Sequence, residues 1–223
     1  MGILRRLAKA VPLFGVLDRY IEMKRFRARI RAMPVTRMGD LAEGVRGKIV
    51  GRAMELEQTL VAPLSGRTCV YWRIEIEDRG EAGVLRGTLA SFDESVAFLL
   101  VQPNTGDDNS LHRAVIDARN ANVRGDRYHT TKSKAAFDAT PAQRALLERE
   151  NLIHRDWFQT TGLEYRESII SIGAQVTVVG EGVREPDPDA EAPDDYRGSV
   201  RTRLRIAGTR DRPIDIDAED DAT

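Results

Sequence analysis

The sequence contains little of the material from which many metal and catalytic sites are made. Its 223 residues include one cysteine, Cys69, and three histidines. A single thiol excludes a disulfide within the chain and any zinc site that needs several cysteines, including a RING. The histidines, His112, His129 and His154, lie too far apart for a metal-ligating motif. We therefore predict no metal site and no cofactor.

Long hydrophobic runs are also absent. The longest uncharged apolar run near the N-terminus, Ala10 to Leu17, has eight residues, whereas a helix that crosses a bilayer needs about 20. This run also lacks the flanks and the cleavage site of a secretory signal. We expect a cytoplasmic protein, or one that is peripheral to a membrane.

Neither sign of charge is in excess, because 34 Lys and Arg stand against 35 Asp and Glu. A net charge of -1 does not favour a nucleic-acid partner. The charges are unevenly distributed, however. Residues 1–33 hold nine basic side chains, and residues 181–195 hold seven acidic ones. This pattern predicts a basic N-terminal segment and an acidic loop late in the chain.

The clearest pattern that is present is an alternation centred on Trp72. Val70, Trp72, Ile74 and Ile76 are expected on one face of a strand, with polar residues mostly on the other. A turn at residues 62–66 precedes this strand. Further strands are expected at residues 45–53, 84–91, 96–101, 111–118, 165–172, 174–179 and 199–207, with a short edge strand at 213–217.

The remaining segments complete the predicted architecture. A helix is expected near residues 141–151, because Thr140, Pro141 and Gln143 form a good helix start. Residues 92–95 are expected to form a turn, and residues 120–140 to be irregular. The sequence thus predicts a mainly β (α+β) fold, a partly open small β-barrel or a wrapped antiparallel sheet, with an N-terminal helix and one inserted helix.

We divide the chain into five segments by composition and pattern. Residues 1–33 are a basic amphipathic helix, and residues 34–184 are a β domain. Residues 185–198 form an acidic loop that contains prolines. Residues 199–217 supply strands that complete the β domain, and residues 218–223 are an acidic tail.

The N-terminal helix is the main candidate for contact with a partner. Its apolar residues recur at helical spacing, and its basic residues lie mostly off that stripe. Three interpretations of this helix remain open. It packs on its own domain with a solvated charged face, it lies on an anionic membrane surface, or it binds a partner protein. The candidate contact residues are Leu7, Val11, Phe14, Leu17, Ile21, Lys24, Arg25, Arg27, Arg29 and Arg31.

The run VAPLSGRTCVYWR, from Val61 to Arg73, resembles the signature of the GIDE domain. This domain, also called the "beside a membrane" domain, occurs in the mitochondrial ubiquitin-ligase activator family and its prokaryotic relatives. Residues 165–180 resemble the closing hairpin of that family. The residues that carry the resemblance are Pro63, Leu64, Ser65, Gly66, Cys69, Tyr71, Trp72, Gly173 and Gly180.

The resemblance implies a mainly β domain used for protein interaction, often next to a membrane. Eukaryotic members have two membrane spans and a C-terminal RING, and this sequence shows neither, so E3 ubiquitin-ligase activity does not carry over. We therefore expect a non-enzymatic interaction or scaffold domain, peripheral to the inner face of a bacterial membrane, with an unknown protein or peptide partner.

Two alternatives belong to other functional classes. In the first alternative, the protein is an accessory component of a ubiquitin-like conjugation system or a hydrolase that uses Cys69, His154 and Asp156. In the second alternative, the protein is a β domain that binds nucleic acid through the arginines of the strand at 199–207. The pattern favours a salt-bridged sheet face over that role for Arg201, Arg203 and Arg205.

Overall fold

The computed structural model describes residues 14–79, 85–102, 113–125, 129–134, 138–153, 162–188 and 202–219. These residues are mainly β, with two α-helices, α1 (Phe14–Ala32) and α2 (Pro141–Arg149). The predicted fold class, with its N-terminal helix and one inserted helix, is confirmed. Thr140 caps α2 by accepting a hydrogen bond from the Gln143 backbone, and the Gln143 side chain completes the capping box.

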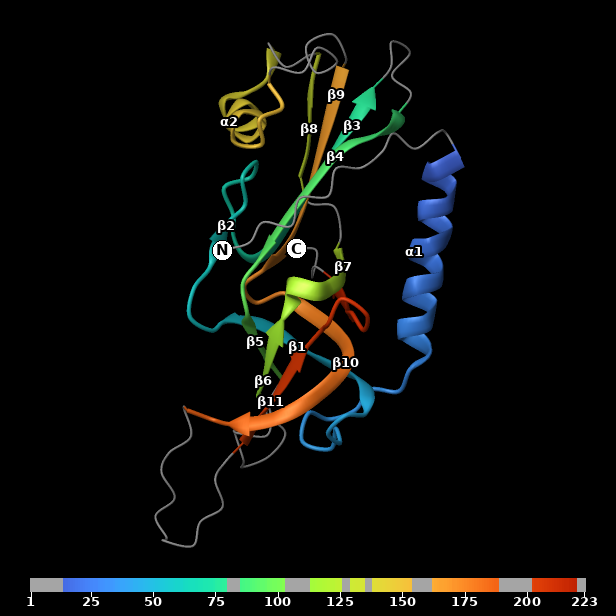
Figure 1. The fold of residues 1–223 in the computed structure, drawn as a ribbon, viewed down its shortest axis with the longest axis vertical. Helices are drawn as coiled ribbons and strands as arrows, with labels where there is room; N and C mark the ends of the chain where they lie inside the picture. Colours follow the sequence, from blue (N-terminus) through green and yellow to red (C-terminus); the bar gives the residue numbers. More distant parts are fainter. Residues whose placement is uncertain are drawn as a thin grey trace, which may run out of the picture.

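The strands form two sheets, one above the other in Figure 1, with α1 alongside. The strands of the barrel sheet are β1 (Arg46–Glu55), β5 (Phe98–Val101), β6 (Arg113–Asp117), β7 (Ala121–Gly125), β10 (Gln175–Pro186), β11 (Thr202–Ala207) and β12 (Ile214–Glu219). The strands of the second sheet are β2 (Leu60–Val61), β3 (Thr68–Arg79), β4 (Leu85–Ser95), β8 (His129–Ser133) and β9 (Gly162–Ser171).

Five strands close into a barrel in the order β1-β5-β6-β11-β10, because β1 also pairs with β10 from Arg46↔Glu181 to Arg52↔Gln175. All neighbours are antiparallel except β6 and β11, which are parallel. This strand order is that of an OB-fold barrel. Barrels of this kind serve many functions, so the topology alone assigns none.

Two strands extend the barrel sheet. β12 pairs antiparallel with β10 and parallel with β7. A strand is present at the predicted residues, as β12. The prediction that it lies at the edge of a sheet is wrong, because β12 lies between β10 and β7. The prediction that residues 120–140 are irregular is also wrong. They contain β7 and β8, whose partners β12 and β9 lie far away in the sequence, so local pattern does not reveal them.

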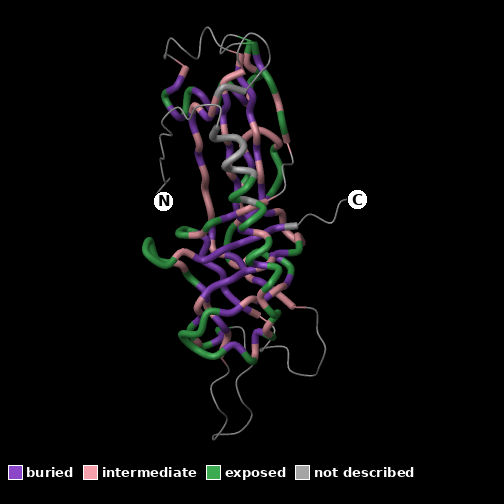
Figure 2. The backbone as a smooth tube through the Cα atoms, turned by 90° about the vertical axis from the view of Figure 1, so that its right-hand side faces the viewer, coloured by how far each residue is buried: buried purple, intermediate pink, exposed green. Residues whose placement is uncertain are grey.

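The second sheet has the order β2-β3-β9-β8, and β4 also pairs with β3. The predicted turn at 92–95 is wrong, because β4 continues to Ser95 and pairs there with Tyr71. Trp72 is 1% exposed and lies in a core that this sheet forms with Leu146 and Leu147 of α2. Figure 2 shows buried residues continuing from this sheet into the barrel.

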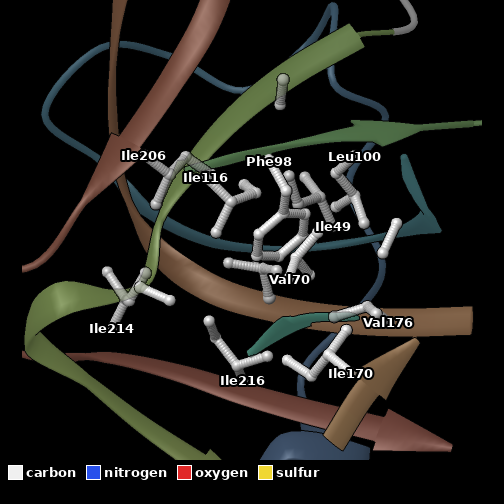
Figure 3. Packing of buried hydrophobic residues seen from close by; sticks show 14 of the residues in the cluster. Ile49, Val70, Phe98, Leu100, Ile116, Ile170, Val176, Ile206, Ile214 and Ile216 are labelled. Atoms are coloured by element: carbon white, nitrogen blue, oxygen red, sulfur yellow. The ribbon is translucent and has the colours of Figure 1, made fainter. Parts of the chain in front are cut away.

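A register shift in β3 divides its side chains between the two cores. Cys69 pairs with Ser171 and Tyr71 with Ile170, so Val70 is an extra residue opposite β9. As a result Val70 lies in the barrel core, among the residues of Figure 3, while Trp72 lies in the second core. The prediction that Val70 shares a face with Trp72 is wrong, because strict alternation ends at this bulge.

Candidate functional site

The predicted contact residues of the first helix fall into three groups. Leu7 and Val11 lie outside the described residues, and Phe14 and Leu17 belong to α1, without a description of their side chains. Ile21 is 37% exposed, which is high for a large apolar side chain. Within the described residues, no helix is long and apolar enough to cross a membrane.

The face of α1 that packs on the barrel is a different one. Phe26 and Ile30, one turn apart, are buried together with Val179 of β10, and Met33 packs against them. Arg29 and Arg124 place their guanidinium groups 5.7 and 5.6 Å from the centre of the Phe26 ring. The helix is thus held to the barrel by a small apolar contact flanked by cations.

Arg27 and Arg29 flank this packed face and meet acidic residues of β12. The Arg27 Nε atom lies 3.5 Å from Asp217 Oδ1, and the Arg29 Nη2 atom lies 3.3 Å from Asp215 Oδ2. Lys24, Arg25 and Arg31 are also exposed. Two arginines of α1 therefore contact acids of β12, and three further cations of the helix have exposed side chains.

Asp215 is a point of convergence for three elements. It accepts hydrogen bonds from Arg29 of α1 (3.3 Å), from Arg46 of β1 (2.9 Å) and from Asn122 of β7 (3.0 Å). Its side chain is only 6% exposed. A buried carboxylate requires such donors, because an unpaired charge in this position is very costly.

An open pocket of about 530 Å³ lies around this carboxylate, between the last turns of α1 and the barrel. Its volume is in the range of small-ligand sites. Arg212, in the turn between β11 and β12, also lines it and is held by Glu181 at 3.3 Å. Ile30, Met33 and Pro213 add apolar surface. The pocket joins arginines, acids and apolar groups from four parts of the chain.

The turn of the sequence signature binds a buried carboxylate of the protein itself. Glu167 of β9 is fully buried, and its two oxygens accept hydrogen bonds from the backbone N–H groups of Leu64 (2.7 Å) and Ser65 (3.0 Å). Gly66 closes this turn with φ of +70°, a conformation that favours glycine. The Pro63–Gly66 run thus acts as an anion-binding turn for Glu167.

The other signature residues also have structural positions. Tyr71 and Trp72 are buried in the two cores. Gly173 has φ of +85° in the turn between β9 and β10. At Gly180 a Cβ atom would lie 2.6 Å from Ile206 and 2.8 Å from Ile214, so only glycine fits between them. These contacts explain the residue types without a bound ligand.

The hydrolase alternative finds no support at Cys69. Burial, and secondarily the nearby charge of Glu167, raise the pKa of the Cys69 thiol to about 12. The thiol is therefore protonated at neutral pH and is a poor nucleophile. His154 and Asp156 lie outside the described residues, and within the described part no cluster of acids, histidines and cysteine could hold a metal.

The arginines considered for nucleic-acid binding are engaged with acids. Arg203 contacts Glu185 at 2.8 Å, and Arg205 contacts both Glu185 (3.5 Å) and Asp117 (3.8 Å). Arg119 also donates to Asp117, and this hydrogen bond lowers the pKa of the Asp117 carboxyl. Arg201 lies outside the described residues. This sheet face is charge-compensated, which disfavours phosphate-backbone binding here.

Of the residues that line the pocket, sequence reasoning singled out only Arg29, as a contact residue of the first helix, and it missed the others. The alternation of Ile214, Asp215, Ile216 and Asp217 does indicate a strand with one acidic face. It does not indicate that α1 supplies the cations for that face, because this contact joins residues almost 190 positions apart.

Comparison of the chain with protein-family models, with curated proteins and with solved structures found no match.

Proposed function

We propose that the protein is a non-enzymatic interaction module that binds peripherally to an anionic surface, the inner face of a bacterial membrane, through the outer side of α1. One observation supports this most directly. α1 packs on the barrel with Phe26 and Ile30, while Ile21, Lys24, Arg25 and Arg31 remain exposed. These four residues lie on α1 away from Phe26 and Ile30, and this is the side on which the proposal places the anionic surface.

The exposed residues form one surface by helical geometry. Ile21 lies one turn before Lys24 and Arg25, and Arg31 lies two turns after Lys24. Each Lys or Arg close to an anionic bilayer contributes about 1 kcal/mol. Three such cations supply about 3 kcal/mol, or a partition increase of roughly 100-fold. Insertion of Ile21 between head groups adds to this.

The β domain serves in this proposal as a scaffold that presents a protein or peptide partner at the surface. The buried, protonated Cys69 and the structural roles of the signature residues support a scaffold rather than a catalyst. The resemblance to the GIDE domain adds the expectation of a position beside a membrane.

The proposal is tested by co-sedimentation with vesicles of phosphatidylcholine, with and without 30% phosphatidylglycerol. The full chain should sediment only with the anionic vesicles, and less so as salt is raised. The triple variant Lys24→Glu, Arg25→Glu and Arg31→Glu should lose at least about 100-fold in partition, since it replaces attraction with repulsion.

A matched control changes the net charge equally at a distance from α1. It carries Lys134→Glu, Arg144→Glu and Arg67→Glu, three other exposed cations, and should retain most of the binding. Equal losses in both triple variants would show a nonspecific charge effect and would contradict the role of α1. Failure of the unaltered chain to sediment would reject the membrane surface as its partner.

A further inference from the structure

Arginines from three separate elements line the pocket beside α1. Arg29 comes from α1, Arg46 from β1, and Arg212 from the turn between β11 and β12. Arg29 and Arg46 both contact the same atom, Asp215 Oδ2. Two guanidinium groups thus meet at one carboxylate oxygen, and over the whole pocket the three arginines are matched in number by Asp215, Glu181 and Asp211.

Most hydrogen-bond donors of these arginines have no acceptor within the part of the protein that the structure describes. Each guanidinium group carries five N–H donors. Among the described residues, Arg29 donates one hydrogen bond, to Asp215, and Arg212 donates one, to Glu181. Arg46 donates two, to Asp215 and to the Pro213 carbonyl. The remaining donors are available to a ligand that enters the pocket.

Exposure decides which charge such a ligand meets. The side chains of Arg29, Arg46 and Arg212 are 64%, 37% and 75% exposed, whereas that of Asp215 is 6% exposed. Asp215 is therefore buried at the pocket, while the two arginines that contact it keep part of their side chains exposed. Carboxylates that fix guanidinium groups in this way reduce the entropy lost when an anion binds.

We propose that this pocket binds a phosphate group, carried either by a lipid head group or by a small soluble ester. Several guanidinium groups that converge from different directions suit a tetrahedral anion with several acceptor oxygens better than a planar carboxylate. The apolar surface of Ile30, Met33 and Pro213 suits the carbon part of such an ester. In its lipid form this inference rests on the proposed membrane function.

Two acids at the pocket oppose an anion and supply a further test. Glu181 already pairs with Arg212, and its side chain is 38% exposed. Asp211 also lines the pocket and is exposed. Because Asp211 repels the incoming anion, Asp211→Asn should strengthen phosphate binding.

The first experiment uses soluble probes and the full chain. Inorganic phosphate and glycerol 1-phosphate are titrated by isothermal calorimetry at low salt. Saturable binding is expected, and Arg46→Gln or Arg212→Gln should weaken it at least about fivefold. Arg212 is the more exposed of the two, so its replacement leaves the fold intact. The control is Arg210→Gln, an exposed arginine two residues away that does not line the pocket.

The second experiment uses vesicles of phosphatidylcholine with 10% phosphatidic acid or phosphatidylglycerol. Weaker sedimentation of Arg212→Gln than of Arg210→Gln identifies a lipid head group as a ligand, and an effect confined to the soluble probes identifies a soluble ester. Absence of saturable phosphate binding in both experiments, or equal effects of the two substitutions throughout, would overturn the proposal.

The outcomes also separate this inference from the proposed function. Loss of vesicle binding in the outer-face triple variant, together with no phosphate binding to the unaltered chain, rejects the pocket alone. Saturable phosphate binding by a chain that never sediments with vesicles rejects the membrane function alone and retains the pocket.

Discussion

Glu167→Gln tests whether the signature turn is held by a buried carboxylate. In the native protein both oxygens of Glu167 accept backbone N–H groups, from Leu64 at 2.7 Å and from Ser65 at 3.0 Å. Glutamine keeps the shape of the side chain but offers one oxygen and one NH2 group. One of the two backbone donors would then face another donor.

The size of the effect follows from these two contacts. A neutral hydrogen bond replaces a charge-assisted one, which costs about 1 kcal/mol, and a backbone donor loses its acceptor, which costs about 1–3 kcal/mol. We therefore expect Glu167→Gln to lower the free energy of unfolding by about 2–4 kcal/mol. Against a total stability of about 5–15 kcal/mol for a typical domain, this is a large fraction.

Urea unfolding followed by far-UV circular dichroism measures this change. With a denaturant slope near 2–3 kcal/mol per molar, the midpoint should fall by about 1 M. The control is Glu57→Gln, which removes the same charge from an exposed residue and should leave the midpoint almost unchanged. A midpoint for Glu167→Gln that is no lower than that of the control would refute the anion-binding role of the turn.

Four further predictions concern the cores, the thiol and the helix. Trp72→Ala should lower the free energy of unfolding by about 3–5 kcal/mol in the same assay, because the buried indole leaves a cavity. Gly180→Ala should cost about 1–3 kcal/mol, since the added methyl group clashes with Ile206; a neutral result would contradict the close approach. Cys69, whose pKa is raised to about 12, should resist iodoacetamide at pH 8 in the folded protein and react in urea. The unfolded state releases this proton above about pH 8.5 and the folded state does not, so stability should decline from there towards pH 12. Asp215→Asn should speed amide hydrogen exchange in residues 21–32, because Arg29 loses its ionic partner; unchanged exchange would show that the Arg29–Asp215 pair is not needed to hold α1.

The sequence predicts those elements whose evidence is local. The capping box of α2 lies within four residues, and the alternation from Trp72 to Ile76 reports a strand with one buried face. The paired strands around Gly173 follow in the same way, because the positive φ of this turn favours glycine. In each case a few neighbouring residues contain both the signal and its cause.

The rest depends on partners that are distant in the chain. Val70 leaves the face of Trp72 because its register is set by β9, about 100 residues later. The strand β12 becomes an interior strand only because β7 pairs with it. In the pocket, Arg29 and Asp215 belong to opposite ends of the sequence. No local periodicity contains this information, so the site could not be predicted.

Closure of the barrel by the β1–β10 contact has a consequence for biosynthesis. Arg46 pairs with Glu181, so β1 leaves the ribosome long before its partner exists. At roughly 5–20 residues per second, this strand waits about 7–27 s with one edge unpaired. During that interval the nascent chain exposes a strand edge that favours aggregation, and β11, the last strand of the barrel, arrives later still. We expect the emerging protein to depend on a chaperone more than its modest size suggests.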